Sequence, residues 1–130
     1  MQIIIIISLA KVILTYLSVV FSGGYIAEAQ LTVTPVNTVS RAGTRVQLQC
    51  TTDAGLSGRI GWYRDPGNDE IVDDCQPESS FPQYNVVKTS VGQCDLVISN
   101  AQLELAATYT CSEGANTAPA TLTVIGELCV

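Results

Sequence analysis

The chain has 130 residues, which is enough for one domain of common size. Its 6 Lys and Arg residues against 12 Asp and Glu residues give a net charge of −6, which disfavours nucleic acid and anionic membrane surfaces as partners. The chain contains no histidine, so it lacks the commonest general base and the commonest metal ligand of proteins.

The first 29 residues have the pattern of a cleaved secretory signal peptide. Two apolar runs at 3–7 and 12–21 are separated by Lys11, and Ala27-Glu28-Ala29 precedes Gln30. An uncleaved membrane anchor is the alternative, but the unbroken apolar run is shorter than the ~20 residues that a span needs. No second apolar run follows. We therefore expect a secreted, extracellular protein with no membrane span in the mature chain, whose cysteines lie in an oxidising compartment.

The remainder of the chain has the pattern of short strands separated by turns. A first edge strand is expected over 31–36, with Pro35 at a bend or a strand switch. Further strands, lettered B, C, C′, D, E, F and G in this order, are expected over 46–50, 60–64, 70–72, 84–89, 94–98, 107–112 and 121–125, with a hairpin loop over 113–117. Alternation assigns the following residues to the core: Val46, Leu48, Trp62, Leu96, Ile98 and Tyr109. The pattern predicts an all-β sandwich of two antiparallel sheets.

Three of these strands carry a recognisable set of residues. Trp62 lies twelve positions after Cys50, and Tyr109 lies two positions before Cys111. This order and spacing are typical of the immunoglobulin-like β-sandwich with Greek-key connections, in which a disulfide joins the sheets, a Trp packs against it and a Tyr forms a corner. We therefore expect a Cys50–Cys111 disulfide in an immunoglobulin-like domain over 30–126, followed by a tail over 127–130.

The other three cysteines can be placed by strand direction in such a sandwich. Cys75 follows the strand over 70–72 and Cys94 begins the strand over 94–98, so both lie at the end of the B–C loop and are expected to form a second disulfide. Cys129 follows the last strand, at the opposite end. It is expected to stay free, to pair with downstream sequence or to link two chains in a covalent dimer. The spacings do not fit a zinc site.

A narrower resemblance rests on the segments 81–87 (Phe-Pro-Gln-Tyr-Asn-Val-Val) and 92–98 (Gly-Gln-Cys-Asp-Leu-Val-Ile). Together with Trp62-Tyr63-Arg64-Asp65 and Ala107-x-Tyr109-x-Cys111, they resemble the membrane-distal immunoglobulin domain of the nephrin/Kirre/Roughest cell-adhesion group. Members of that group bind one another between cells through the sheet of strands C, C′, F and G (the CC′FG sheet). The resemblance therefore implies a protein partner, with a second copy of the chain among the candidates.

The chain departs from the pattern of its relatives at several positions. Leu105 replaces the usual Asp before Ala-x-Tyr-x-Cys, and Cys75 and Cys94 are additions. Ala118-Pro119-Ala120 replaces the Gly-x-Gly bulge of antigen-receptor variable domains, which disfavours pairing of the variable type. The adhesion proteins also have several domains and a membrane anchor, so this chain alone does not establish an adhesive role.

The expected binding face centres on Tyr63, which points outward from its strand and is an aromatic type enriched at interface hot spots. Ile71, Glu113 and Asn116 are expected to flank it, although a packing residue and an ordinary hairpin tip are the alternative interpretations. We predict no catalytic set, no metal site and no cofactor, because no base partner or ligand series accompanies the Ser and acidic residues.

The sequence therefore predicts a secreted module that recognises another protein through its CC′FG face. One alternative is a soluble immune molecule that binds microbial or glycan ligands through its B–C, C′–D and F–G loops. Another is a fragment of a multi-domain adhesion receptor with a spacer role.

Overall fold

The computed structural model describes residues 30–53 and 59–126. The predicted signal peptide, the middle of the B–C loop and the tail with Cys129 lie outside the described residues. In the part of the chain that is described, no helix has the length and apolar character to cross a membrane.

Short strands account for most of the domain, as predicted. Their bounds are β1 Leu31–Val33, β2 Thr38–Arg41, β3 Thr44–Leu48, β4 Thr51–Thr52, β5 Ile60–Asp65, β6 Asp69–Asp73, β7 Gln76–Pro77, β8 Tyr84–Val87, β9 Asp95–Ala101, β10 Ala107–Glu113 and β11 Asn116–Ile125. A 3-10 turn, η1, spans Leu103–Leu105, within the connection that precedes β10.

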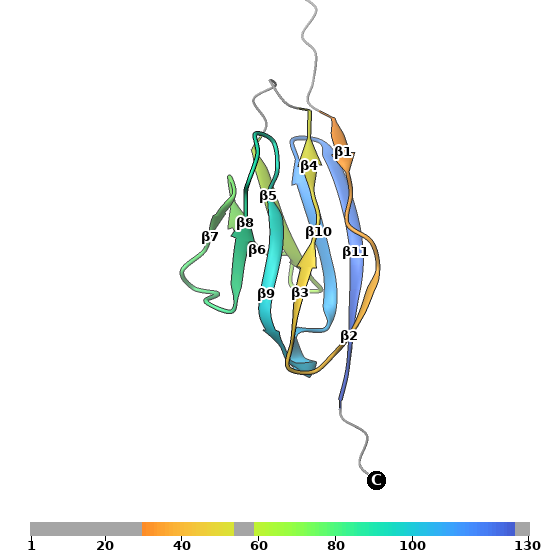
Figure 1. Cartoon of the computed structure of the whole chain (residues 1–130). Coiled ribbons are helices and arrows are strands. Elements are labelled where there is room, and N and C mark those ends of the chain that lie inside the picture. The colour runs from red at the N-terminus through yellow and green to blue at the C-terminus, as the bar shows by residue number, and fades with distance from the viewer. Residues whose placement is uncertain (1–29, 54–58, 127–130) are drawn as a thin grey trace, which may run out of the picture.

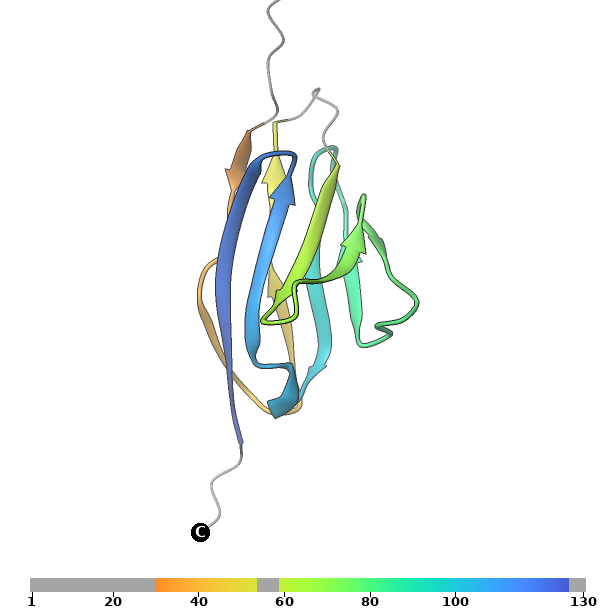
Figure 2. The ribbon, with the colours of Figure 1, turned by 180° about the vertical axis from the view of Figure 1, so that it is seen from behind.

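The strands form two facing layers, which confirms the predicted sandwich. One layer is a six-stranded sheet in the order β2-β11-β10-β5-β6-β7, and the other contains β3-β9-β8 together with the β1-β4 pair. Figure 1 views the molecule from the β3-β9-β8 side, and Figure 2 shows β11, β10 and β5 from behind. Among the described strands, β2 and β11 pair in parallel, which differs from the predicted purely antiparallel sheets.

The parallel pair follows from a strand switch at Pro35. β1 pairs with β4 in one layer, whereas β2 pairs with β11 in the other. Pro35 lies between β1 and β2, is buried and has no N–H to donate to a ladder. The predicted switch at this proline is confirmed, and it brings the first strand alongside the last.

The core is built around the bridge between Cys50 and Cys111, whose Cα atoms lie 6.4 Å apart. Trp62 pairs directly with Cys111 across β5 and β10, and its Nε1 donates to the Cys94 carbonyl at 2.9 Å. The core positions predicted by alternation are each at most 4% exposed: Val46, Leu48, Trp62, Leu96, Ile98 and Tyr109. The loop closed by this disulfide spans 61 residues, which corresponds to about 4 kcal/mol in the chain-entropy model.

A Tyr corner anchors β10 to the η1 turn that precedes it. The Tyr109 hydroxyl donates to the Leu105 carbonyl at 2.6 Å and lies 2.9 Å from the Tyr84 hydroxyl. The two rings meet edge to face with centroids 5.7 Å apart. Leu105, which replaces the usual Asp, is itself buried at the end of η1. The corner is therefore formed by a backbone carbonyl and does not need the missing carboxylate.

The second disulfide joins Cys75 and Cys94, with Cα atoms 5.7 Å apart. Cys75 follows β6 and its N–H donates to the Ile60 carbonyl at 2.8 Å, while Cys94 immediately precedes β9. The bridge therefore ties the β6–β7 turn to the opposite layer, as strand direction predicts.

Asp95 is a buried charge that alternation does not predict. Its side chain is 1% exposed, and its carboxylate accepts from Gln47 Nε2 at 2.8 Å, Gln93 Nε2 at 3.0 Å and the Cys50 N–H at 3.0 Å. Gln47 also accepts from Arg45 Nη1 at 3.0 Å. The carboxylate thus has three donors, which offset the cost of removing a charge from water.

Candidate partner-binding face

The outward surface of the six-stranded sheet has Tyr63 near its centre. Tyr63 on β5 pairs with Thr110 on β10, and Thr110 pairs with Pro119 on β11. Residues directly opposite one another share a face of the sheet. Tyr63 and Thr110 are half-buried and Pro119 is exposed, whereas Tyr109 and Cys111, which flank Thr110, are fully buried. The row therefore points away from the core.

The β10 and β11 part of this surface carries no charged side chain. Alternation brings to it Thr108, Thr110, Ser112, Thr117, Pro119, Thr121 and Thr123. We call these seven residues together with Tyr63 the Tyr63 face. Short hydroxyl side chains leave such a surface flat and lightly hydrated compared with one of Lys and Glu. A neutral strip of this kind in a protein of net charge −6 can be covered without burying unpaired charges.

Proline fits into this face because β11 has an open edge there. β2 pairs only with Leu122–Ile125, and the Thr121 N–H is met instead by Asn37 Oδ1 at 2.8 Å. Pro119 lies two residues before Thr121, so its missing N–H falls on the same open side. The β10–β11 register continues through Ala118-Pro119-Ala120 without a bulge. The strip is therefore regular along its length.

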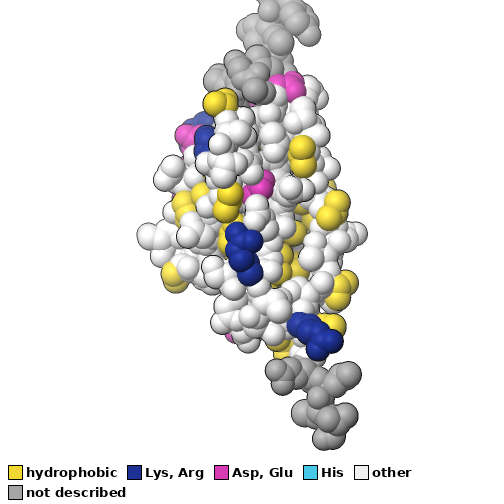
Figure 3. Space-filling model, in the orientation of Figure 1, with side chains coloured by type: hydrophobic (Ala, Val, Ile, Leu, Met, Phe, Trp, Pro, Cys, Tyr) yellow, Lys and Arg dark blue, Asp and Glu magenta, His cyan; other side chains and the backbone are white. Residues whose placement is uncertain are grey.

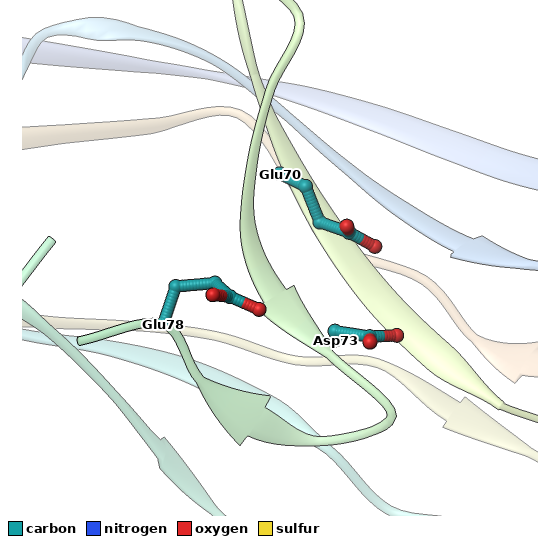
Figure 4. A group of neighbouring side chains, drawn as sticks. All are labelled: Glu70, Asp73 and Glu78. Atoms are coloured by element: carbon teal, nitrogen blue, oxygen red, sulfur yellow. The ribbon is translucent and has the colours of Figure 1, made fainter. Parts of the chain in front are cut away.

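An acidic group borders the Tyr63 face on β6. The Tyr63 hydroxyl donates to Glu70 Oε2 at 3.2 Å. Carboxylate oxygens of Glu70, Asp73 and Glu78 all lie within 4.8 Å of one another, and Figure 4 shows them gathered along the β6–β7 hairpin. Arg59 Nη2 meets Asp73 Oδ1 at 2.8 Å, which offsets part of this negative charge. Burial and the nearby Glu70 raise the pKa of Tyr63, so its phenol stays protonated in neutral solution.

A shallow groove of about 460 Å³ continues the face toward the end of the sheet where β10 begins. Pro66, Ala107, Thr108, Thr121 and Thr123 are among its lining residues. Its walls are mostly methyl and methylene groups with scattered hydroxyls, and Asp65 contributes the one charged side chain among the lining residues. A partner side chain could lie in it beside the flat strip.

Three of the four residues predicted to form the binding face do not lie on it. Ile71 is 0% exposed, because the ladder shifts between Trp62 and Tyr63 and Glu70, rather than Ile71, pairs with Tyr63. Its assignment to the face is wrong, and it is a core residue. Only Tyr63 keeps the predicted outward position.

Glu113 and Asn116 are displaced by the shape of the F–G hairpin. The predicted loop over 113–117 is a two-residue turn, Gly114-Ala115, so both strands keep their alternation up to the pair Glu113–Asn116. Glu113 continues the buried row of β10 and is 9% exposed, opposite Ile60, while Asn116 Nδ2 donates to Glu113 Oε1 at 3.4 Å. These two residues close the end of the core and do not flank Tyr63.

The two-layer fold, with Trp62 packed beside the Cys50–Cys111 disulfide, defines an immunoglobulin-like sandwich, and comparison with known families agrees. The family model for the immunoglobulin domain matches residues 29–113, which is more than half of the chain. The chain therefore belongs to the immunoglobulin domain family.

Several solved structures have the same fold. One is the crystal structure of Dpr1 IG1 bound to DIP-eta IG1, with a TM-score of 0.71 and 12% identity over 78% of this chain and 100% of that chain. The RIG-5 IG1 homodimer has a TM-score of 0.67 and 16% identity over 76% of this chain and 99% of that chain. Rst D1-D2 has a TM-score of 0.66 and 21% identity over 77% of this chain and 50% of that chain. At these identities the likeness establishes the fold.

Proposed function

We propose that the chain is an extracellular recognition module that binds another protein through the Tyr63 face, with a second copy of itself as the partner. Export by the signal sequence over 1–29 would deliver it outside the cell, where its disulfides persist. Its action would be binding by surface contact, as is usual for immunoglobulin domains, and not chemistry on a substrate.

The proposal rests on one observation: the uncharged strip on β10 and β11 lies beside an outward-facing aromatic residue, Tyr63. Interface cores are depleted in charge and enriched in Tyr, and rigid sheets lose little conformational entropy on binding. The Tyr63 hydroxyl donates to Glu70 Oε2 and its backbone is paired on both sides, with β10 and β6, so its place on the sheet is set before binding. The Tyr63 face has these properties together.

A second copy fits this face on electrostatic grounds. Two chains of net charge −6 repel each other, and the repulsion is least where the approaching surfaces carry no charge. The β10–β11 part of the Tyr63 face meets that condition. A two-fold axis near Thr110 would place Tyr63 of each copy over the neutral strip of the other, which is the usual geometry of a symmetric dimer.

Known immunoglobulin domains of this fold support a protein partner. Dpr1 IG1 has been crystallised bound to DIP-eta IG1, and RIG-5 IG1 as a homodimer. The resemblance to the nephrin/Kirre/Roughest group points to the same sheet of the domain. The loop-binding alternative has less support, because the F–G connection contributes only a two-residue turn.

The proposal is tested by sedimentation velocity of the secreted chain over a range of concentrations. Cys129→Ser is used as the parent, so that a disulfide-linked dimer cannot contribute. We expect a reversible dimer that Tyr63→Ala and Thr110→Glu each weaken by at least about tenfold, because a central aromatic residue or a new like charge at a two-fold axis costs more than about 1.4 kcal/mol.

Gln49→Glu is the matched control for the added charge. Gln49 is exposed and lies between β3 and β4 in the opposite layer, so this variant should dimerise like its parent. If the chain remains monomeric at every concentration and binds no other immunoglobulin domain through Tyr63, the proposal is wrong. Equal weakening by Gln49→Glu would also contradict it, since the effect would then come from net charge.

A further inference from the structure

A second surface lies on the other layer, away from the Tyr63 face. A groove of about 400 Å³ runs between the start of β8, the end of β9 and η1, at the lower end of the domain in Figure 1. Four carboxamides and two other polar side chains line it: Gln83, Asn85, Asn100, Gln102, Ser99 and Glu104. In Figure 3 the surface over this end of β8 and β9 is mostly white, which means few charged or hydrophobic side chains.

Three of the four carboxamides, those of Asn85, Asn100 and Gln102, take part in hydrogen bonds that use one half of the group. Gln102 Nε2 donates to Asn100 Oδ1 at 2.7 Å, a bond that does not use the Asn100 amide hydrogens or the Gln102 oxygen. Asn85 Oδ1 accepts the Val86 N–H at 2.9 Å, which leaves the Asn85 amide hydrogens. The groove thus presents donors and acceptors side by side, the arrangement that two neighbouring hydroxyl groups match because each can donate and accept.

The lining excludes other classes of ligand. Glu104 is the one charged residue among those that line the groove, so a metal ion finds one carboxylate there. The neighbouring cation, Arg64, is not a lining residue, and its Nη2 donates to the Glu104 backbone carbonyl at 2.5 Å, so an anion finds no lining cation. An apolar ligand would bury the carboxamides without partners. An extended peptide would need the free ladder edge of β8 to continue along the groove, but β8 begins at Tyr84 and Pro82, two residues before it, has no N–H to donate.

The floor and one side of the groove offer apolar contact to a ligand. Leu105 is buried at its base and Pro82 is exposed at its side, so both offer carbon surface next to the polar groups. Sugars present the same combination, with C–H groups on the ring faces and hydroxyls at the rim. We propose that this groove binds a neutral oligosaccharide, with Asn100, Gln102, Asn85 and Glu104 as hydrogen-bonding residues. The site is independent of the Tyr63 face.

The test is an NMR titration of the ¹⁵N-labelled secreted chain with neutral oligosaccharides of glucose, mannose, galactose and N-acetylglucosamine. The side-chain NH₂ signals of Asn85 and Asn100 report directly from the groove. We expect at least one series to shift them saturably. Asn100→Ala and Gln102→Ala should each weaken that binding by roughly tenfold. Each substitution removes at least one hydrogen bond to the sugar and leaves the sugar hydroxyl that made it without a partner.

Two controls separate the groove from other effects. Gln49→Ala removes an exposed carboxamide elsewhere in the same layer, and Tyr63→Ala removes the centre of the other face; both should bind the sugar like the unmodified chain. The backbone spectra of the groove variants should stay unchanged, because the substituted side chains lie outside the core. Failure of all four series to shift these signals would overturn the inference. So would tighter binding of sulfated heparin fragments, or binding that survives in the Asn100→Ala, Gln102→Ala double variant.

Discussion

Asp95→Asn tests the buried network that joins the sheet layer of β3 and β9 to the D–E turn. The substitution keeps the shape of the side chain but replaces one carboxylate oxygen by an NH₂ group. If the remaining oxygen faces Gln47 and Gln93, the Cys50 N–H is left against another donor, which costs about 1–3 kcal/mol. The two remaining bonds change from charged to neutral, which costs about 1 kcal/mol each.

The opposite orientation of the amide is no better. It would set the new NH₂ group against both glutamine donors, and Gln93 cannot turn to compensate because its Oε1 already accepts from Thr89 N–H at 3.0 Å, Thr89 Oγ1 at 2.6 Å and Ser90 Oγ at 3.3 Å. We therefore expect a loss of about 3–5 kcal/mol, or a fall of at least about 12 °C in Tm for a domain of this size.

The assay is urea unfolding of the purified chain followed by Trp62 fluorescence, since this Trp lies in the core beside the disulfide. Asp69→Asn is the matched control: Asp69 is exposed, so the same loss of charge should change the unfolding free energy by less than about 0.5 kcal/mol. A loss below about 1 kcal/mol in Asp95→Asn, at an unchanged m-value, would refute the reasoning that the carboxylate is held by three cooperating donors.

Three further outcomes are expected. Replacing both Cys75 and Cys94 by Ala should lower the unfolding free energy by about 3 kcal/mol in urea while leaving a folded domain, because the loop they close spans 19 residues; an unfolded product would contradict this. Gly92→Ala should cost about 1–3 kcal/mol by the same assay, because φ is +84° there and a Cβ would lie 2.7 Å from the Thr52 carbonyl; unchanged stability would show that the turn adapts. Burial and the hydrogen bond to a neighbouring phenol raise the pKa of Tyr109 above 10.0, so the folded state holds this proton more tightly and stability should fall above pH 10 by up to about 1.4 kcal/mol per pH unit; the same slope in Tyr109→Phe would count against it.

Most of the fold can be predicted, because a few residues mark contacts between strands that are far apart in the sequence. The order of Cys50, Trp62 and Cys111 identifies two strands that face each other across a sandwich, and the alternation around them assigns the core. Strand direction alone was sufficient to bring Cys75 and Cys94 to one end. Such features depend on period and topology, which a sequence records directly.

The binding face was harder to predict, because small local irregularities decide which side chains point outward. One ladder shift beside Tyr63 moves Ile71 into the core, since a slip of one residue exchanges the two faces of a strand. The tight F–G turn extends alternation to Glu113 and turns it inward. Asp95 was missed because its donors come from other strands and from the D–E turn, and no local pattern marks their convergence.

The most direct test of the Tyr63 face is to map which backbone amides respond when the chain associates. The ¹⁵N-labelled Cys129→Ser chain is diluted in steps, and amide signals that change with concentration are assigned to strands. The account predicts changes on β5, β10 and β11, centred on Tyr63, Thr110 and Pro119's neighbours, with β3, β8 and β9 unaffected. Changes confined to the β3-β9-β8 layer, or association that leaves the Tyr63 row unperturbed, would contradict it.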